Sequence, residues 1–137
     1  MSAFRWPARI RFSDTDASGR IHYSSLFRHF EAAEEEFLRT LGFDYSRIGR
    51  GECAWPRVHA ECDISGALRH DDAVETEVSV DSVGRSSFAL SYLVRNAGTE
   101  CARGRVVIVC MDAATQKARA IPPLFATALR AQLQQLP

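Results

Sequence analysis

Residues 23–41, YSSLFRHFEAAEEEFLRTL, carry the single long helical pattern of the chain, and this pattern dictates how the rest must pack. Apolar side chains recur at steps of three and four residues, which places them along one face of an α-helix. This apolar stripe consists of Leu26, Phe30, Ala33, Phe37 and Leu41, and it is widened by Phe27 and Leu38. The Glu34-Glu35-Glu36 run is expected to form a solvated face. Ser24 or Ser25 is expected to cap the start of the helix.

Alternating patterns on both sides of the helix predict five β-strands. The first lies before the helix, over residues 4–12, and Pro7 favours an edge position for it because proline has no N–H to donate. The other four follow the helix, over residues 54–65, 73–83, 86–95 and 100–112, and a short helix begins at Pro122-Pro123. Short turns between consecutive strands indicate an antiparallel sheet. The long helix has only this sheet to pack on, so the predicted class is α+β, with the helix across one face.

The last predicted strand contains a run, VVIVCM at residues 106–111, that is apolar on both faces. A strand buried on both sides should lie centrally in the sheet, or its second face should pack on a partner subunit. Because one helix covers only one face of a sheet, we expect the chain to associate with itself, as a homodimer or a homotetramer.

The composition describes one ordinary globular domain over residues 1–137. Hydrophobic residues make up 46% of the chain and charged residues 25%, which argues against disorder. The 17 basic and 17 acidic residues give a formal charge of zero, so no nucleic-acid partner is expected. No apolar run approaches the roughly 20 residues of a membrane-spanning helix, and the first residues lack the apolar region of a secretory signal. We therefore expect a cytoplasmic protein with no integral membrane segment.

The four cysteines are interpreted as reduced, small buried side chains. They are Cys53, Cys62, Cys101 and Cys110, and none forms a C-x-x-C pair. His70-Asp71-Asp72 could suggest a metal site, but no further ligands stand at metal-type spacing, so this segment is expected to form a turn. No metal is expected.

The loop between the first strand and the helix is the best candidate for chemistry. It carries Asp14, Asp16 and Gly19, and His22 and Tyr23 follow at the start of the helix. A helix start presents unpaired N–H groups, which can hold an oxyanion while a nearby carboxylate attacks or activates water. Gly19 would let the loop turn tightly and approach a ligand. Aspartates before a helix are more often caps or turn formers, so this pattern alone does not establish a catalytic site.

The segment DTDASGRIHYSSLF, residues 14–27, resembles the D-x-D-x-x-G signature of hotdog-fold acyl-CoA thioesterases. The chain is most similar to the Tol–Pal-associated (YbgC-like) group, next to the 4-hydroxybenzoyl-CoA thioesterases, and residues 4–7, 109–112 and 119–122 extend the likeness. The resemblance implies a hotdog fold, in which a five-stranded antiparallel sheet wraps around one long central helix. It also implies hydrolysis of an acyl-CoA thioester to a carboxylic acid and CoA, with no cofactor beyond the coenzyme A of the substrate.

The resemblance assigns roles to individual residues. Asp16 matches the catalytic carboxylate of the family, as general base or nucleophile, and the Tyr23 N–H falls at the position that polarises the thioester carbonyl. Asp14 is expected to organise the loop. The coenzyme A contacts of the family commonly lie on a strand turn that here contains Arg85, Ser86 and Ser87.

Two departures from the family pattern limit what the resemblance implies. YbgC-like members often have Tyr-His where this chain has His22-Tyr23, so His22 is either a catalytic residue or one that packs and bonds the loop. Glu34 stands where an arginine is common, so the substrate preference is not carried over. Two alternatives stay open: a hotdog dehydratase or hydratase, which would depend on His22, and a non-catalytic module that binds acyl-CoA or acyl-carrier protein.

Overall fold

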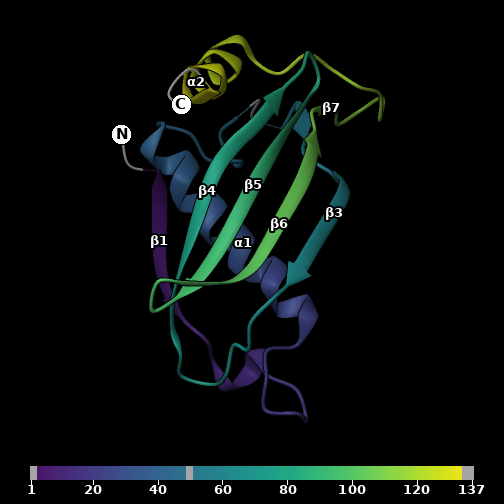
Figure 1. Cartoon of the computed structure of the whole chain (residues 1–137). Coiled ribbons are helices and arrows are strands. Elements are labelled where there is room, and N and C mark those ends of the chain that lie inside the picture. The colour runs from purple at the N-terminus through teal and green to yellow at the C-terminus, as the bar shows by residue number, and fades with distance from the viewer. Residues whose placement is uncertain (1–2, 49–50, 134–137) are drawn as a thin grey trace.

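The computed structural model describes residues 3–48 and 51–133, and it shows a long helix lying against a five-stranded sheet (Figure 1). The helix, α1, spans Tyr23–Thr40, which confirms the predicted range except for its last residue. Both ends of the expected domain, residues 1–2 and 134–137, lie outside the described residues, as do residues 49–50.

The sheet is antiparallel throughout, and the expected hotdog arrangement of a sheet around one helix is confirmed. Its strands, in spatial order, are β1 (Phe4–Arg9), β4 (Ala73–Val83), β5 (Ser87–Asn96), β6 (Thr99–Val109) and β3 (Arg57–Ile64). β1 lies at an edge, as Pro7 predicted. β6, which carries most of the apolar run VVIVCM, is an interior strand that pairs with β5 on one side and with the edge strand β3 on the other. The alternative, that its second face packs on a partner subunit, stays a prediction. Val106 and Ile108 of β6 are buried, while Val107 and Val109 on its other face are only half-buried.

Two of the predicted strands are interrupted. The strand expected over residues 54–65 is divided at Pro56 into β2 (Cys53–Ala54) and β3, because proline cannot donate to a ladder. The strand expected over residues 100–112 is divided into β6 and β7 (Met111–Asp112), and β7 pairs with β2 in a small second sheet. The first strand ends at Arg9, since a 3-10 turn, η1 (Phe12–Asp14), follows it.

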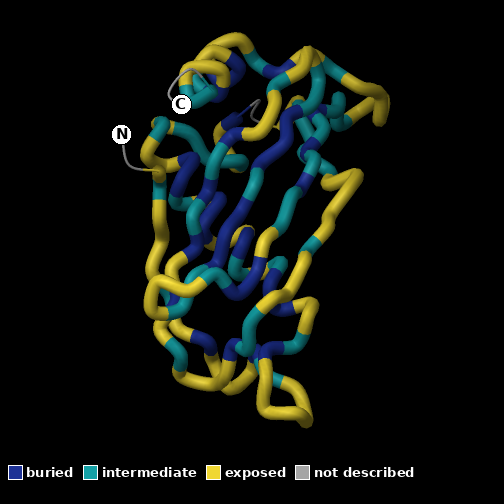
Figure 2. The backbone as a smooth tube through the Cα atoms, viewed as in Figure 1, coloured by how far each residue is buried: buried dark blue, intermediate teal, exposed yellow. Residues whose placement is uncertain are grey.

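The apolar stripe of α1 packs on one face of the sheet, and this contact forms the core. Buried residues of the helix and of the inner strands are dark blue in Figure 2. The most buried members of the stripe, each at most 3% exposed, are Leu26, Phe30, Ala33, Phe37 and Leu38. The Phe30 ring stacks on the Tyr92 ring of β5 with 4.6 Å between centroids. Gly104 of β6 leaves the space that Phe30 occupies, because a Cβ at that position would lie 2.5 Å from the Phe30 Cζ. This glycine therefore sets how closely the helix approaches the sheet.

The remaining elements close the upper end of the sheet in Figure 1. Helix α2 (Pro123–Leu133) packs beside β4 and buries Phe125 and Leu129. All four cysteines are free; Cys101 and Cys110 are buried as expected, while Cys53 and Cys62 are half-buried. Within residues 3–48 and 51–133, neither helix has the length and apolar character that a bilayer span requires. The turn expected at His70-Asp71-Asp72 is confirmed, with Asp71 at φ +74°.

Candidate active site

His22 caps the start of α1, so the expectation that Ser24 or Ser25 is the cap is wrong. Its Nδ1 accepts a hydrogen bond from the Ser24 N–H at 3.2 Å and lies 2.8 Å from the Ser24 hydroxyl. A side-chain acceptor at this position satisfies one of the N–H groups that a helix start leaves unpaired. The His22 ring also stacks on the Tyr23 ring, with 4.6 Å between centroids. Of the two roles considered for His22, the structure displays loop bonding and packing.

The Tyr23 N–H is the first donor of α1, and no residue in the described part of the chain accepts a hydrogen bond from it. The N–H groups of the next two residues are both occupied by His22, through its ring and its carbonyl. A free N–H at a helix N-terminus carries the positive end of the helix dipole. The side chain of Tyr23 is 68% exposed, so this end of the helix is open to a ligand.

Asp16 lies in a tight hairpin that projects beside the start of α1. The Asp16 N–H donates to the Arg20 carbonyl at 2.9 Å, and the Gly19 N–H donates back to the Asp16 carbonyl at 3.0 Å. Gly19 has φ +81°, which confirms that a tight turn is formed at this position. Thr15 and Ile21 form the next rung of the ladder.

The Asp16 carboxylate is ionised and exposed in the single chain. Its Oδ1 accepts hydrogen bonds from the Ser18 hydroxyl at 2.6 Å and the Ser18 N–H at 2.8 Å. These two bonds, the hydroxyl first, lower the pKa of Asp16 below its ordinary value, and the nearby His22 contributes in the same direction. Its second oxygen, Oδ2, accepts no hydrogen bond from the described residues, so it is available to water or a ligand.

Asp14 fixes this hairpin to the helix, as expected for a residue that organises the loop. Its main-chain carbonyl accepts the His22 N–H at 2.7 Å, while its Oδ2 accepts the Arg11 N–H at 2.8 Å and lies 3.0 Å from the His29 Nε2. Burial would raise the pKa of Asp14, but the bond from Arg11 and the His29 contact outweigh it, so the pKa is lowered. Arg28 lies 3.7 Å from Oδ1 and adds to this effect.

The turn that contains Arg85, Ser86 and Ser87 lies far from these residues in a single chain. The hairpin contacts the segment just before β4, since the Ile21 N–H donates to the Leu68 carbonyl at 2.7 Å. The turn follows the other end of β4, which is 11 residues long, or about 36 Å at about 3.3 Å per residue. Figure 1 shows this turn at the top of the view and the start of α1 near the bottom. One chain thus brings Asp16, Gly19, His22 and Tyr23 together but leaves the expected coenzyme A contacts apart.

Comparison with known proteins identifies the family. The sequence model of the thioesterase-like superfamily matches residues 10–129. The chain belongs to this superfamily. A putative esterase of Aquifex aeolicus is 36% identical to this chain over 91 residues, which cover 66% of this chain and 71% of the relative. The acyl-CoA thioester hydrolase YbgC of Escherichia coli O6:H1 is 29% identical over 120 residues, covering 87% and 90%.

Solved structures agree with this assignment. A gentisyl-coenzyme A thioesterase superposes on the thioesterase with a TM-score of 0.82 at 26% identity, covering 91% of this chain and 98% of that one. The expectation of a thioester hydrolase is thereby confirmed for the enzyme class.

The sequence patterns missed a polar cluster between α1 and the sheet, formed by Glu34 of α1, Arg57 of β3 and Tyr92 of β5. The expectation that Glu34 belongs to a solvated face is wrong: this thioesterase buries Glu34 to 1% exposure, while Glu35 is exposed. The Tyr92 hydroxyl donates to Glu34 Oε1 at 2.6 Å, and Arg57 forms an ion pair with Oε2. Burial, followed by the Glu34 charge, raises the pKa of Tyr92, so its hydroxyl remains a donor. Only the spacing of Glu34 within the stripe, four residues after Phe30, indicated an inward position.

Proposed function

We propose that this thioesterase hydrolyses an acyl-CoA thioester at the N-terminal end of α1, releasing the carboxylic acid and CoA. The observation that carries the proposal is that the ionised Asp16 lies in the hairpin that leads into α1, whose first N–H, that of Tyr23, has no acceptor among the described residues. Asp16 pairs opposite Arg20, two residues beyond the Asp14–His22 link, which corresponds to about 7 Å of extended chain. The thioester carbonyl oxygen would accept the Tyr23 N–H, so the negative charge that develops on it meets the helix dipole.

Two routes to products are open to Asp16. As a general base, its carboxylate takes a proton from water, the water oxygen bonds to the acyl carbon, and the C–S bond breaks to release the thiolate. As a nucleophile, Oδ2 bonds to the acyl carbon and expels the thiolate, and water then hydrolyses the mixed anhydride. The lowered pKa of Asp16 keeps its carboxylate ionised at neutral pH, which both routes require.

A complete site would require a second copy of the chain. The Arg85 turn is about 36 Å along β4 from the hairpin, so any contact of this turn with the same coenzyme A must come from another subunit. The edge strand β3 exposes Val58 and Ile64 and leaves its outer hydrogen-bonding groups open to such a partner. The expected homodimer or homotetramer is therefore part of the proposal, and light scattering at micromolar concentration tests it. A monomer would contradict it.

The central experiment is the Asp16→Asn variant, with release of free thiol from a panel of acyl-CoAs as the readout. Removal of the carboxylate charge should lower kcat/KM by about 10²–10⁴. Asp44→Asn is the matched control, because Asp44 also accepts hydrogen bonds from a serine hydroxyl and a main-chain N–H in a turn, those of Ser46 and Arg47, but follows the C-terminal end of α1. Near-native turnover by the Asp16 variant would remove the proposal.

Isotope labelling separates the two routes, and the same assay separates the alternative functions. In a single turnover in heavy-oxygen water, label in the Asp16 carboxylate establishes attack by Asp16 followed by hydrolysis of the anhydride at the Asp16 carbonyl carbon, because general-base catalysis places the label only in the product acid. A dehydratase or hydratase would release no thiol from any acyl-CoA. A non-catalytic binding module would bind acyl-CoA without turnover, and the binding would survive the loss of the Asp16 charge.

A further inference from the structure

The buried cluster around Glu34 plays no part in the reaction described above. Both carboxylate oxygens of Glu34 are occupied, by the Tyr92 hydroxyl and by Arg57. The Arg57 guanidinium lies over the Tyr45 ring, 4.9 Å from its centroid, and the buried Tyr45 hydroxyl has no hydrogen-bond partner among the described residues. Glu34 is a buried carboxylate, whereas the Arg57 side chain that pairs with it is 30% exposed. Burial of a carboxylate costs free energy even when it is paired, so stability alone does not account for this cluster.

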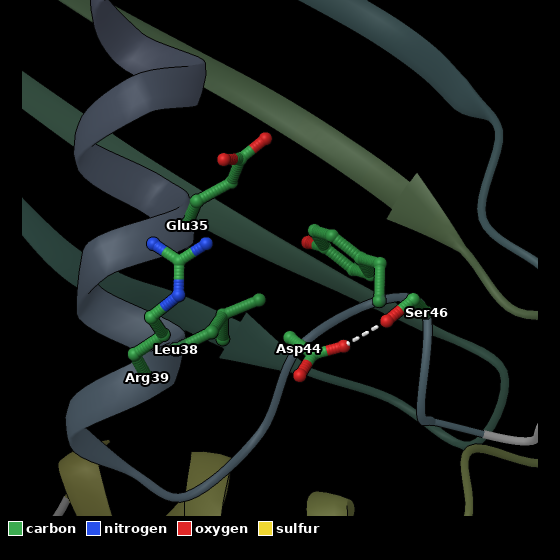
Figure 3. A pocket seen from close by; sticks show the side chains of 6 residues that line it. Glu35, Leu38, Arg39, Asp44 and Ser46 are labelled. Atoms are coloured by element: carbon green, nitrogen blue, oxygen red, sulfur yellow. Dashed lines mark hydrogen bonds between the residues drawn. The ribbon is translucent and has the colours of Figure 1, made fainter.

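Two pockets lie in line along α1, on the two sides of the Arg57–Tyr45 stack. The proximal pocket, of ≈ 200 Å³, has Arg57 at its wall and includes Phe27 and Phe30 of α1. The distal pocket, of ≈ 300 Å³, has Tyr45 at its wall and includes Leu38 of α1 (Figure 3). The α1 residues that line the proximal pocket precede those that line the distal pocket in the sequence, so the two pockets follow one another along the helix axis. The stack is the partition between them.

The proximal pocket begins close to the proposed oxyanion position. Phe27 lies one helical turn after Tyr23, about 6 Å along the axis, and Glu34 lies about 16 Å from Tyr23 at about 1.5 Å per residue. An acyl group whose carbonyl is held at Tyr23 would therefore run past Phe27 and Phe30 before it meets the ion pair. A volume of ≈ 200 Å³ holds about seven groups the size of a water molecule.

We propose that the Glu34–Arg57 pair is a stop that limits the acyl group to about eight carbons or to one compact ring, a specificity that rests on the proposed function. A longer aliphatic chain would have to separate the pair and leave the Glu34 carboxylate buried without its partner. That separation costs more than the burial of a few methylene groups gains. Removal of the pair joins the proximal and distal pockets and admits longer chains.

Binding of non-hydrolysable acyl-CoA thioethers, measured by calorimetry, tests the stop without any need for turnover. For the wild-type thioesterase, affinity should rise from four to eight carbons and fall at least tenfold at twelve. In the double variant Glu34→Gln/Arg57→Ala, which avoids an unpaired buried charge and keeps an acceptor for the Tyr92 hydroxyl, twelve carbons should bind at least as tightly as eight. The control Asp81→Asn/Arg105→Ala, which removes an exposed ion pair of 2.7 Å, should keep the wild-type profile.

The wild-type profile alone can overturn the inference, so the outcome does not depend on the variant folding. A wild-type thioesterase that binds sixteen carbons as tightly as eight, or that binds no thioether, refutes the stop. A folded double variant with the wild-type profile, as judged by circular dichroism, also refutes it. Absence of thiol release from every acyl-CoA would instead refute the proposed function, while the binding series would still decide whether the stop exists.

Discussion

Tyr23→Pro tests the proposed oxyanion contact, because it removes the N–H at a helix position that accepts proline, and the accompanying loss of the ring can be controlled separately. Tyr23 is the first residue of α1, a position at which proline is tolerated since its N–H has no helical partner. The preceding residue, His22, has φ −71° and ψ 135°, which is the extended conformation that a residue before proline requires. The substitution should therefore leave the helix intact.

Tyr23→Pro should have a large effect on turnover and a small effect on stability. Loss of one oxyanion donor lowers kcat by about 10²–10³, or about 2.7–4 kcal/mol of transition-state stabilisation. The stability should change by less than about 0.5 kcal/mol, as for a surface substitution. With an unfolding entropy of about 2.1 cal/mol/K per residue over 137 residues, this corresponds to a shift in Tm of less than about 2 °C.

Thiol release and thermal unfolding are measured on the same samples. Tyr23→Ala is the control for loss of the exposed ring, because it keeps the N–H, and it should retain most of its kcat. If Tyr23→Pro folds as the wild type does and turns over at a similar rate, the carbonyl is not held by this N–H and the placement of the substrate is wrong.

Three further outcomes follow from the packing and the electrostatics. Gly104→Ala should lower stability by about 1–3 kcal/mol, because its Cβ would overlap the Phe30 ring, whereas Gly84→Ala, with 3.4 Å to its nearest neighbour, should have little effect in the same thermal melts. Asp14→Asn should be less stable than the wild type at neutral pH and should lose less stability on acidification. The pKa of Asp14 is lower in the folded state than its ordinary 3.8, so its contribution is present above that value and is lost as the pH falls through the lowered pKa; equal acid limbs in unfolding measurements would contradict this. The Asp16 carboxylate stays ionised above about pH 4, so kcat/KM should not change with pH there. It should fall only at a pH below 3.8, the ordinary pKa of an aspartate. A fall in kcat/KM near pH 6 would show that another group controls the reaction.

The architecture could be predicted from the sequence because its main signals are local. The periodicity of residues 23–41 fixed the long helix, and Pro7 placed its strand at an edge, since both depend on the residue's own backbone and immediate neighbours. The strand break after Val109 was missed because the apolar run VVIVCM continues across it without a turn residue. The break at Pro56 was missed although proline cannot donate to a ladder.

The candidate site was predictable only in part. Asp16 and the helix start are consecutive in the chain, so a short motif brings them together. Glu34 was assigned to the surface because its partners, Arg57 and Tyr92, are 23 and 58 residues away, and helical periodicity carries no information on such distant contacts. His22 was not expected to be the cap because serine is the commoner capping residue. The cytoplasmic location and the roles of Arg85 and its neighbours remain predictions.

The edge strand β3 has a consequence for how the protein behaves when it is alone. Nearly all of its residues are exposed, and β6 pairs with only one of its two sides. An extended segment of another chain can pair with such a strand through main-chain hydrogen bonds, and the exposed apolar side chains of Val58 and Ile64 would pack against it. Substitutions that prevent the partner from covering this edge should therefore yield a folded species that is prone to aggregate, and Val58→Lys should suppress that aggregation.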